Sequence, residues 1–196
     1  MQALARTSAK SLTLKHVYEP RAPSELREAW LRKDRTIERD AADFWRANHL
    51  LPDGVFPDER FGELCMAAYD GASLIALTTA RIRFIGFLGV KLVMLRVAVA
   101  PDKRQNRLAT IIQAESRELL ERWSAENPEQ EVMGMGTVTQ THLFDERGPA
   151  RGLLRSSHLA FIGWTANGEH MRVAWFDHGR IPRTRPEPKS SSQDGF

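Results

Sequence analysis

The chain has 196 residues, of which 42% are hydrophobic, and its formal net charge is +3 at pH 7. This length and composition fit one globular domain with a substantial core. The small positive net charge is compatible with an anionic ligand and does not require nucleic acid as a partner. The one cysteine, Cys65, excludes an internal disulfide, and no Cys/His cluster of ligand spacing points to a metal site. A reducing, cytoplasmic compartment is the default expectation.

Neither a membrane span nor a secretory signal is predicted, while the basic, acid-free residues 1–15 leave an organelle transit peptide as the minority alternative. The longest apolar stretch, residues 84–99, is interrupted by Lys91 and Arg96, and it is shorter than the about 20 residues that cross a bilayer. Residues 1–15 lack the apolar region of a secretory signal. We expect a flexible terminus at 1–11, one domain at 12–178, and a disordered tail rich in Pro, Ser and charge at 179–196.

The first part of the chain reads as one strand and two helices. A weak alternation predicts a strand at 12–17, and Ser24 is a plausible N-cap for a helix that runs through Leu31. A second helix at 37–49 has an apolar face, and the Pro- and Gly-containing stretch 51–60 is a loop.

The pattern then changes to strands. Strands are predicted at 63–69 and 73–84, and the hairpin signal Asp70-Gly71 joins them. A third strand is predicted at 91–100. It is apolar on both faces apart from Arg96, as expected for a central strand. After Pro101 the apolar period becomes helical from about residue 106 to 126.

The last part predicts a strand at 132–139, a helix at 150–157, and two strands at 159–165 and 171–176 joined by Asn167-Gly168. The predicted fold class is therefore mixed α/β, of the α+β type, in a single domain with about four helices.

The unit at 91–126 suggests phosphate binding. A helix N-terminus presents unpaired N–H groups and partial positive charge, so a tight loop entering it can hold a pyrophosphate. Ala109 is small enough for close approach of the backbone, and Lys103, Arg104 and Arg107 add positive charge. The alternative is a charged, solvated connection between a strand and a helix.

Residues Val97 to Ile112 resemble motif A of the GNAT superfamily of N-acyltransferases. Val99-Ala100-Pro101 matches its V-x-P, Arg104 matches its arginine, and Ala109 matches its final Gly/Ala. The element order across residues 12–177 is also similar to a whole GNAT domain. The resemblance implies a mixed, mostly antiparallel sheet that is splayed at an acyl-CoA site.

The resemblance implies a cofactor site for acetyl-CoA or another acyl-CoA, with no metal. The residues expected there are Val97, Ala98, Val99, Arg104, Gln105, Asn106, Arg107, Leu108 and Ala109. Arg107 departs from the motif, which has glycine at this position. A glycine-type backbone there would cost on the order of 1 kcal/mol, whereas a helical backbone would cost nothing.

The catalytic groups are less well marked. The family often uses a tyrosine after the fifth strand, but Tyr18 and Tyr69 lie elsewhere, and Ser156 falls near that position. His142 and His158 are alternative proton carriers near neutral pH. For all three, a surface or structural role is the competing interpretation.

Arg81, Arg83 and Arg96 are candidates for binding a carboxylate or phosphate on the acceptor, the alternative being a solvent-facing strand with a salt bridge. The predicted function is direct transfer of acetyl from acetyl-CoA to a primary amine of a small molecule or peptide. A longer acyl chain, a non-catalytic acyl-CoA-binding module, and a homodimer through edge strands are also open. Nucleic acid is the weakest alternative, because no basic aromatic stripe is present.

Overall fold

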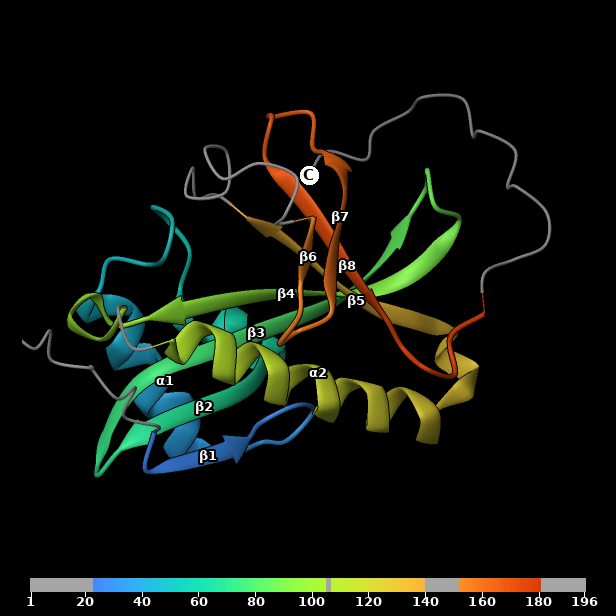
Figure 1. Ribbon diagram of the computed structural model, residues 1–196. Coiled ribbons are helices and arrows are strands. Elements are labelled where there is room, and N and C mark those ends of the chain that lie inside the picture. Colours follow the sequence, from blue (N-terminus) through green and yellow to red (C-terminus); the bar gives the residue numbers. More distant parts are fainter. Residues whose placement is uncertain (1–22, 105–106, 140–151, 181–196) are drawn as a thin grey trace, which may run out of the picture.

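The computed structural model describes residues 23–104, 107–139 and 152–180, and the elements below are those of these residues. Eight strands form one sheet in the order β1-β2-β3-β4-β5-β8-β7-β6. All neighbouring strands are antiparallel except β4 and β5, which are parallel. Helices lie on both faces of the sheet (Figure 1). The expected α+β domain with a mixed, mostly antiparallel sheet is confirmed.

The first half of the described chain contains β1 (Glu25–Glu28), α1 (Arg35–Ala47), a 3-10 helix (Pro57–Glu63), β2 (Leu64–Asp70) and β3 (Ser73–Ile85). The predicted strand at 12–17 lies outside the described residues. The predicted helix from Ser24 to Leu31 is wrong, because β1 occupies this stretch and pairs with β2. Ser24 caps no helix: its N–H and its hydroxyl both donate to the carbonyl of Tyr69, at 2.9 and 3.0 Å. Long-range pairing overrode the local capping signal.

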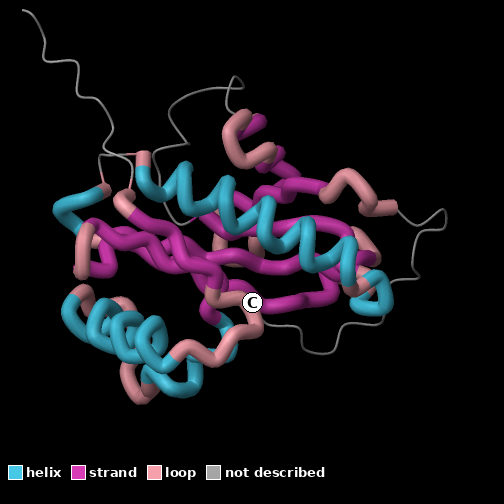
Figure 2. Tube along the Cα trace, turned by 90° about the horizontal axis from the view of Figure 1, so that it is seen from below, coloured by secondary structure: helices cyan, strands magenta, loops and turns pink. Residues whose placement is uncertain are grey.

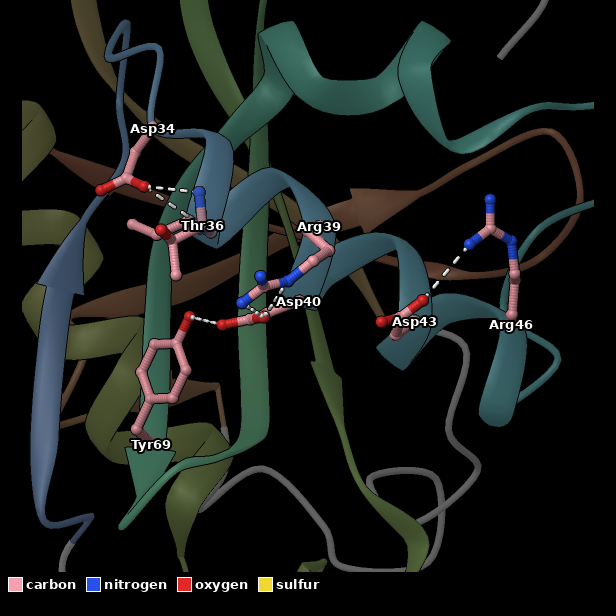
Figure 3. Close-up of polar contacts among 8 residues, drawn as sticks. Asp34, Thr36, Arg39, Asp40, Asp43, Arg46 and Tyr69 are labelled. Atoms are coloured by element: carbon pink, nitrogen blue, oxygen red, sulfur yellow. Dashed lines mark hydrogen bonds and ion pairs between the residues drawn. The ribbon is translucent and has the colours of Figure 1, made fainter.

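The predicted helix at 37–49 is confirmed as α1. Its N-cap is Asp34, whose carboxylate accepts from the backbone N–H groups of Thr36 and Ile37 at 2.8 and 3.2 Å (Figure 3). This cap satisfies donors that the helix itself leaves unpaired. The apolar side of the helix is buried against β2 and β3 and consists of Ile37, Ala41, Phe44 and Trp45.

The second half contains β4 (Val90–Val99), a 3-10 helix (Pro101–Lys103), α2 (Leu108–Glu126), a 3-10 helix (Pro128–Gln130), β5 (Val132–Thr139), β6 (Leu153–Leu154), β7 (Leu159–Trp164) and β8 (His170–Trp175). The strands predicted from residue 63 onward all form, with ends that differ by no more than one residue. The helix predicted at 150–157 is wrong for its described part, because β6 and a turn occupy it and β6 pairs back onto β7.

The helices α1 and α2 cover opposite faces of the sheet (Figure 2). On the α2 face, Leu108, Ile112 and Leu120 pack with Ala80 and Leu95 of the strands. Two α-helices are thus present among the described residues, where four helices were expected. No helix in this part of the chain is long and apolar enough to cross a bilayer.

Candidate functional site

The parallel strands β4 and β5 pair along only part of their length. The last partners are Met94 and Gly136, and beyond them β4 pairs only with β3 while β5 pairs only with β8. The two strands therefore diverge toward their carboxyl ends (Figure 1). We call the gap between Leu95–Val99 of β4 and Thr137–Thr139 of β5 the fork.

Backbone groups of β4 are directed into the fork. The N–H of Ala100 donates to the carbonyl of Ile75, its direct partner on β3, at 2.9 Å. Bonded pairs alternate along an antiparallel ladder, so Ala98 and Arg96 also bond β3. The N–H and C=O groups of Val97 and Val99, which lie between them, face the other way, toward the fork. The C=O of Leu95 faces the fork as well, whereas its N–H belongs to the last pair with β5, Met94–Gly136.

Two glycines lie on β5 where it runs beside β4 and β8. A Cβ at Gly136 would come within 2.6 Å of the Sδ atom of Met94, and a Cβ at Gly134 would come within 2.6 Å of the carbonyl oxygen of Ala174. A side chain at position 134 would therefore meet the backbone of β8, and one at position 136 would require the Met94 side chain to move.

The loop from β4 to α2 brings positive charge to the open end of the fork. The Nε atom of Arg104 donates to the carbonyl of Val99 at 3.4 Å, which is one of the groups that face away from β3. The Nζ atom of Lys103 lies 3.6 Å from a carboxylate oxygen of Asp70, which links the loop to the β2–β3 turn. The loop is thus anchored on both sides.

The N-terminus of α2 is suited to an anion. Its N-cap, Arg107, makes no capping hydrogen bond with its side chain, and the first turn contains no acidic residue. Helix α1 differs, because Asp34 caps it. The first N–H groups of α2 and its partial positive charge therefore face the loop without a carboxylate of their own helix.

Arg107 adopts the glycine-type conformation, with φ of 53° and ψ of 11°. The helical backbone that would have carried no steric cost is therefore not the one observed. Glycine is the residue that occupies this left-handed region without steric cost. Residue 107 therefore has a backbone conformation that glycine favours, although an arginine occupies it.

Helix α2 is held firmly against the sheet behind this loop. Leu108 is buried, and the hydroxyl of Ser116 lies 2.9 Å from that of Thr78 on β3 while it donates to the carbonyl of Ile112 at 2.7 Å. Cys65 is buried in the same core, and its burial raises the pKa of the thiol to about 12. This argues against Cys65 as a nucleophile.

The structure locates most of the predicted cofactor residues around one place. Val97 and Val99 border the fork, Arg104 and Arg107 lie on the loop, and Leu108 and Ala109 begin α2. Ala98 directs its backbone N–H toward β3, and Gln105 and Asn106 lie outside the described residues. Sequence reasoning missed Leu95 and the opposing edge 137–139, although the glycines of β5 were a signal for close strand contact.

The three candidate arginines lie on one face of β3 and β4. Arg96, opposite Thr79, lies beside the fork, while Arg83, opposite Leu92, is farther along the paired part. Arg81 lies between them and forms an ion pair with Glu63. Arg83 and Arg96 are exposed and form no ion pair with any described residue.

The two catalytic candidates that the structure describes do not lie at the fork. His142 lies outside the described residues. Ser156 and His158 are exposed in the turn between β6 and β7, and β8 lies between β7 and β5. Their side chains form no hydrogen bond or ion pair with described residues, so their roles stay predictions.

No family model and no curated protein matches the sequence. Solved structures do match the fold. One is an acetyltransferase of the GNAT family from Streptococcus pneumoniae, with a TM-score of 0.50 and 12% identity, covering 78% of this chain and 98% of that one. Another is a bacterial toxin, with a TM-score of 0.51 and 13% identity, covering 79% and 91%.

A third match is a mutant of the toxin AtaT bound to the C-terminus of the antitoxin AtaR, with a TM-score of 0.50 and 12% identity, covering 78% of this chain and 91% of that one. At these identities the likeness establishes the fold alone. The chain has a GNAT-like fold.

Proposed function

We propose that this chain binds an acyl-CoA at the fork and transfers the acyl group, most simply acetyl, to a primary amine. One observation carries the proposal: the unpaired edge of β4 leads directly into a loop that ends at an N-terminus of α2 without a capping side chain. Coenzyme A has amides along its pantetheine arm and a pyrophosphate beyond them. A strand edge suits the first, and a helix N-terminus suits the second.

The residues then divide by role. Leu95, Val97 and Val99 would hold the pantetheine amides through their backbone groups, and Arg104 and Arg107 would neutralise the pyrophosphate together with the first N–H groups of α2. Gln105 and Asn106 complete the loop in this proposal. No metal takes part.

Transfer is proposed to be direct. The neutral amine nitrogen attacks the thioester carbonyl, a C–N bond forms, the C–S bond breaks, and the proton lost by nitrogen goes to the departing thiolate. A backbone N–H such as that of Val97 would stabilise the negative charge that develops on the carbonyl oxygen. Positioning of the amine beside the carbonyl supplies much of the acceleration. His142, Ser156 and His158 are the proposed proton carriers, directly or through water.

Ligand binding is the first test. Thermal unfolding would be followed with acetyl-CoA, longer acyl-CoAs, free CoA and an oligonucleotide, since a ligand that binds only the folded state raises Tm. We expect CoA species to raise Tm and the oligonucleotide not to. Arg104→Met should weaken acetyl-CoA binding about tenfold, whereas Arg46→Met, an exposed arginine on α1, should not. Absence of a shift with every CoA species would overturn the proposal.

Activity is the second test. Release of CoA thiol would be measured with acetyl-CoA and a panel of amines that includes peptides and carboxylated amines. Binding of CoA without thiol release against the whole panel would favour a non-catalytic acyl-CoA-binding module. If a carboxylated amine is the acceptor, Arg96→Met should raise its KM with little change in kcat, and Arg83→Met should leave both unchanged because Arg83 lies farther from the fork.

A further inference from the structure

One edge of β3 is only half covered by its neighbour. Strand β2 begins at Leu64, opposite Thr79, whereas β3 continues to Ile85. No other described strand pairs with β3 on that side. The stretch Ala80–Ile85 therefore forms an open strand edge, which we call the β3 edge.

The backbone of the β3 edge has its hydrogen-bonding groups in the right direction to add a strand. By the same alternation that orients β4, Arg81 and Arg83 bond β4 through their N–H and C=O groups. The N–H and C=O groups of Ile82 and Phe84 then point toward the open side, whereas Ala80 adjoins the last pair with β2 and is buried. Such a row of unpaired groups is a template for an extended peptide.

A hollow of about 420 Å³ lies along this edge. One wall is aromatic, since Trp30 and Trp123 meet edge to face with ring centroids 5.3 Å apart. Phe84 continues the apolar side beyond the hollow and is 53% exposed. The residues that line the hollow include Trp30, Trp123, Ile82, Arg81 and Glu63.

The opposite face of the edge is positive. Arg81 and Arg83 project from it, and both are exposed. Glu63 pairs with Arg81 but also with Arg60, at 2.7 Å, so one carboxylate serves two guanidinium groups. Arg83 has no acidic partner among the described residues. The face therefore carries positive charge that an incoming acidic side chain can pair with.

A second copy of this chain is disfavoured in the register that would cover the edge from Ala80 to Phe84. Antiparallel self-pairing centred on Ile82 would place Arg83 directly opposite the partner's Arg81. Like charges in this position destabilise a strand pair.

We infer that the β3 edge binds an extended peptide by strand addition, with acidic side chains opposite Arg81 and Arg83 and apolar side chains opposite Ile82 and Phe84. This site goes beyond the proposed transferase function. It borders the part of β4 that is still paired with β5, and the fork opens in the other direction from Met94. Peptide binding is therefore expected to be independent of acyl-CoA.

The first experiment uses the full chain and a short fluorescent peptide in which glutamate and valine alternate, followed by anisotropy. A peptide with lysine in place of glutamate is the control. We expect the glutamate peptide to bind at least about tenfold more tightly. Arg83→Glu should reduce its affinity and increase that of the lysine peptide. No binding of the glutamate peptide, or equal binding of both peptides, would overturn the inference.

A second pair of variants tests strand addition itself. Ile82→Pro removes an N–H that faces the open edge and leaves the bonds to β4 in place, whereas Ile82→Ala shortens the same side chain and keeps the N–H. We expect binding to be lost only in the proline variant, with circular dichroism and the cooperativity of thermal unfolding checking the fold in both. Equal binding by the two variants contradicts strand addition.

Light scattering without peptide supplies the remaining control. We expect that the chain does not self-associate through the β3 edge. The wild type and Ile82→Pro should therefore have the same mass in solution. Concentration-dependent self-association that Ile82→Pro abolishes would show that a second copy occupies the edge, and it would overturn the inference.

Discussion

Met94 of β4 lies directly beside Gly136 of β5 in the last pair that the two strands form before they separate. A Cβ on residue 136 would lie 2.6 Å from the Met94 Sδ atom and 3.2 Å from its Cε atom. The contact between the Met94 side chain and the backbone of Gly136 thus lies at the closed end of the fork.

Gly136→Ala should destabilise the fold by about 1–2 kcal/mol, because the Met94 side chain must move to make room. The Met94→Ala background removes the clash, so the two substitutions should be non-additive by about 1 kcal/mol. Urea unfolding of both single variants and the double variant measures this. Full additivity would show that a side chain at position 136 does not compete with Met94 for space.

Gly134→Ala should cost more than Gly136→Ala. Its Cβ would lie 2.6 Å from the carbonyl oxygen of Ala174, a backbone atom in the ladder between β5 and β8. A backbone atom cannot rotate away as the end of a methionine can. The same urea series would contradict this order if Gly134→Ala proved the milder change.

Arg107→Gly should stabilise the folded state by up to about 1 kcal/mol, because φ of 53° carries a steric cost for any residue with a Cβ. Arg107→Ala removes the same charge and keeps the cost, so it should leave stability nearly unchanged. Denaturation midpoints at equal m-values test the difference. Both variants should bind acetyl-CoA more weakly if the guanidinium contacts phosphate.

Cys65 should not react with a thiol reagent in the folded protein. The side chain is fully buried, and its pKa is raised to about 12 by that burial, so neither access nor thiolate is available near neutral pH. Ala125→Cys, on the exposed side of α2, is the positive control. Release of nitrothiobenzoate from DTNB should be fast for the control and should require unfolding for the wild type. Fast reaction of folded wild-type protein would contradict the buried position.

Tyr69 should make stability fall at alkaline pH. Its hydroxyl donates to Asp40 at 3.0 Å (Figure 3), and burial followed by this bond raises its pKa from 10.0 to about 12. The folded state then holds the proton longer than the unfolded chain does. The stabilisation is complete below pH 10 and is lost as pH rises through about 12.

Tyr69→Phe tests this in a Cys65→Ala, Tyr18→Phe background, which removes the thiol and the other tyrosine. The unfolding free energy should decline less steeply between pH 10 and 12 than with Tyr69 present. Loss of the bond to Asp40 should also cost about 1 kcal/mol at neutral pH. Identical pH profiles would show that Tyr69 does not titrate as its burial implies.

Local chemistry allowed much of the sheet to be predicted. Alternation over 73–84, the hairpin signal Asp70-Gly71 and the change to a helical period after Pro101 all correspond to observed elements. The helix predicted after Ser24 does not form. The Ser24 hydroxyl instead donates to the carbonyl of Tyr69, which is distant in sequence. A single sequence gives no sign of such a partner.

The sequence by itself determined the strand, loop and helix that form the candidate phosphate site, because period, proline and positive charge are local properties. Only the tertiary structure decided that Arg107 is left-handed, that Leu95, Val97 and Val99 face an open fork, and that Arg83 lies apart from Arg96. These features depend on the register between strands and on where two strands stop pairing. Both are set by contacts between distant residues, which no local pattern encodes.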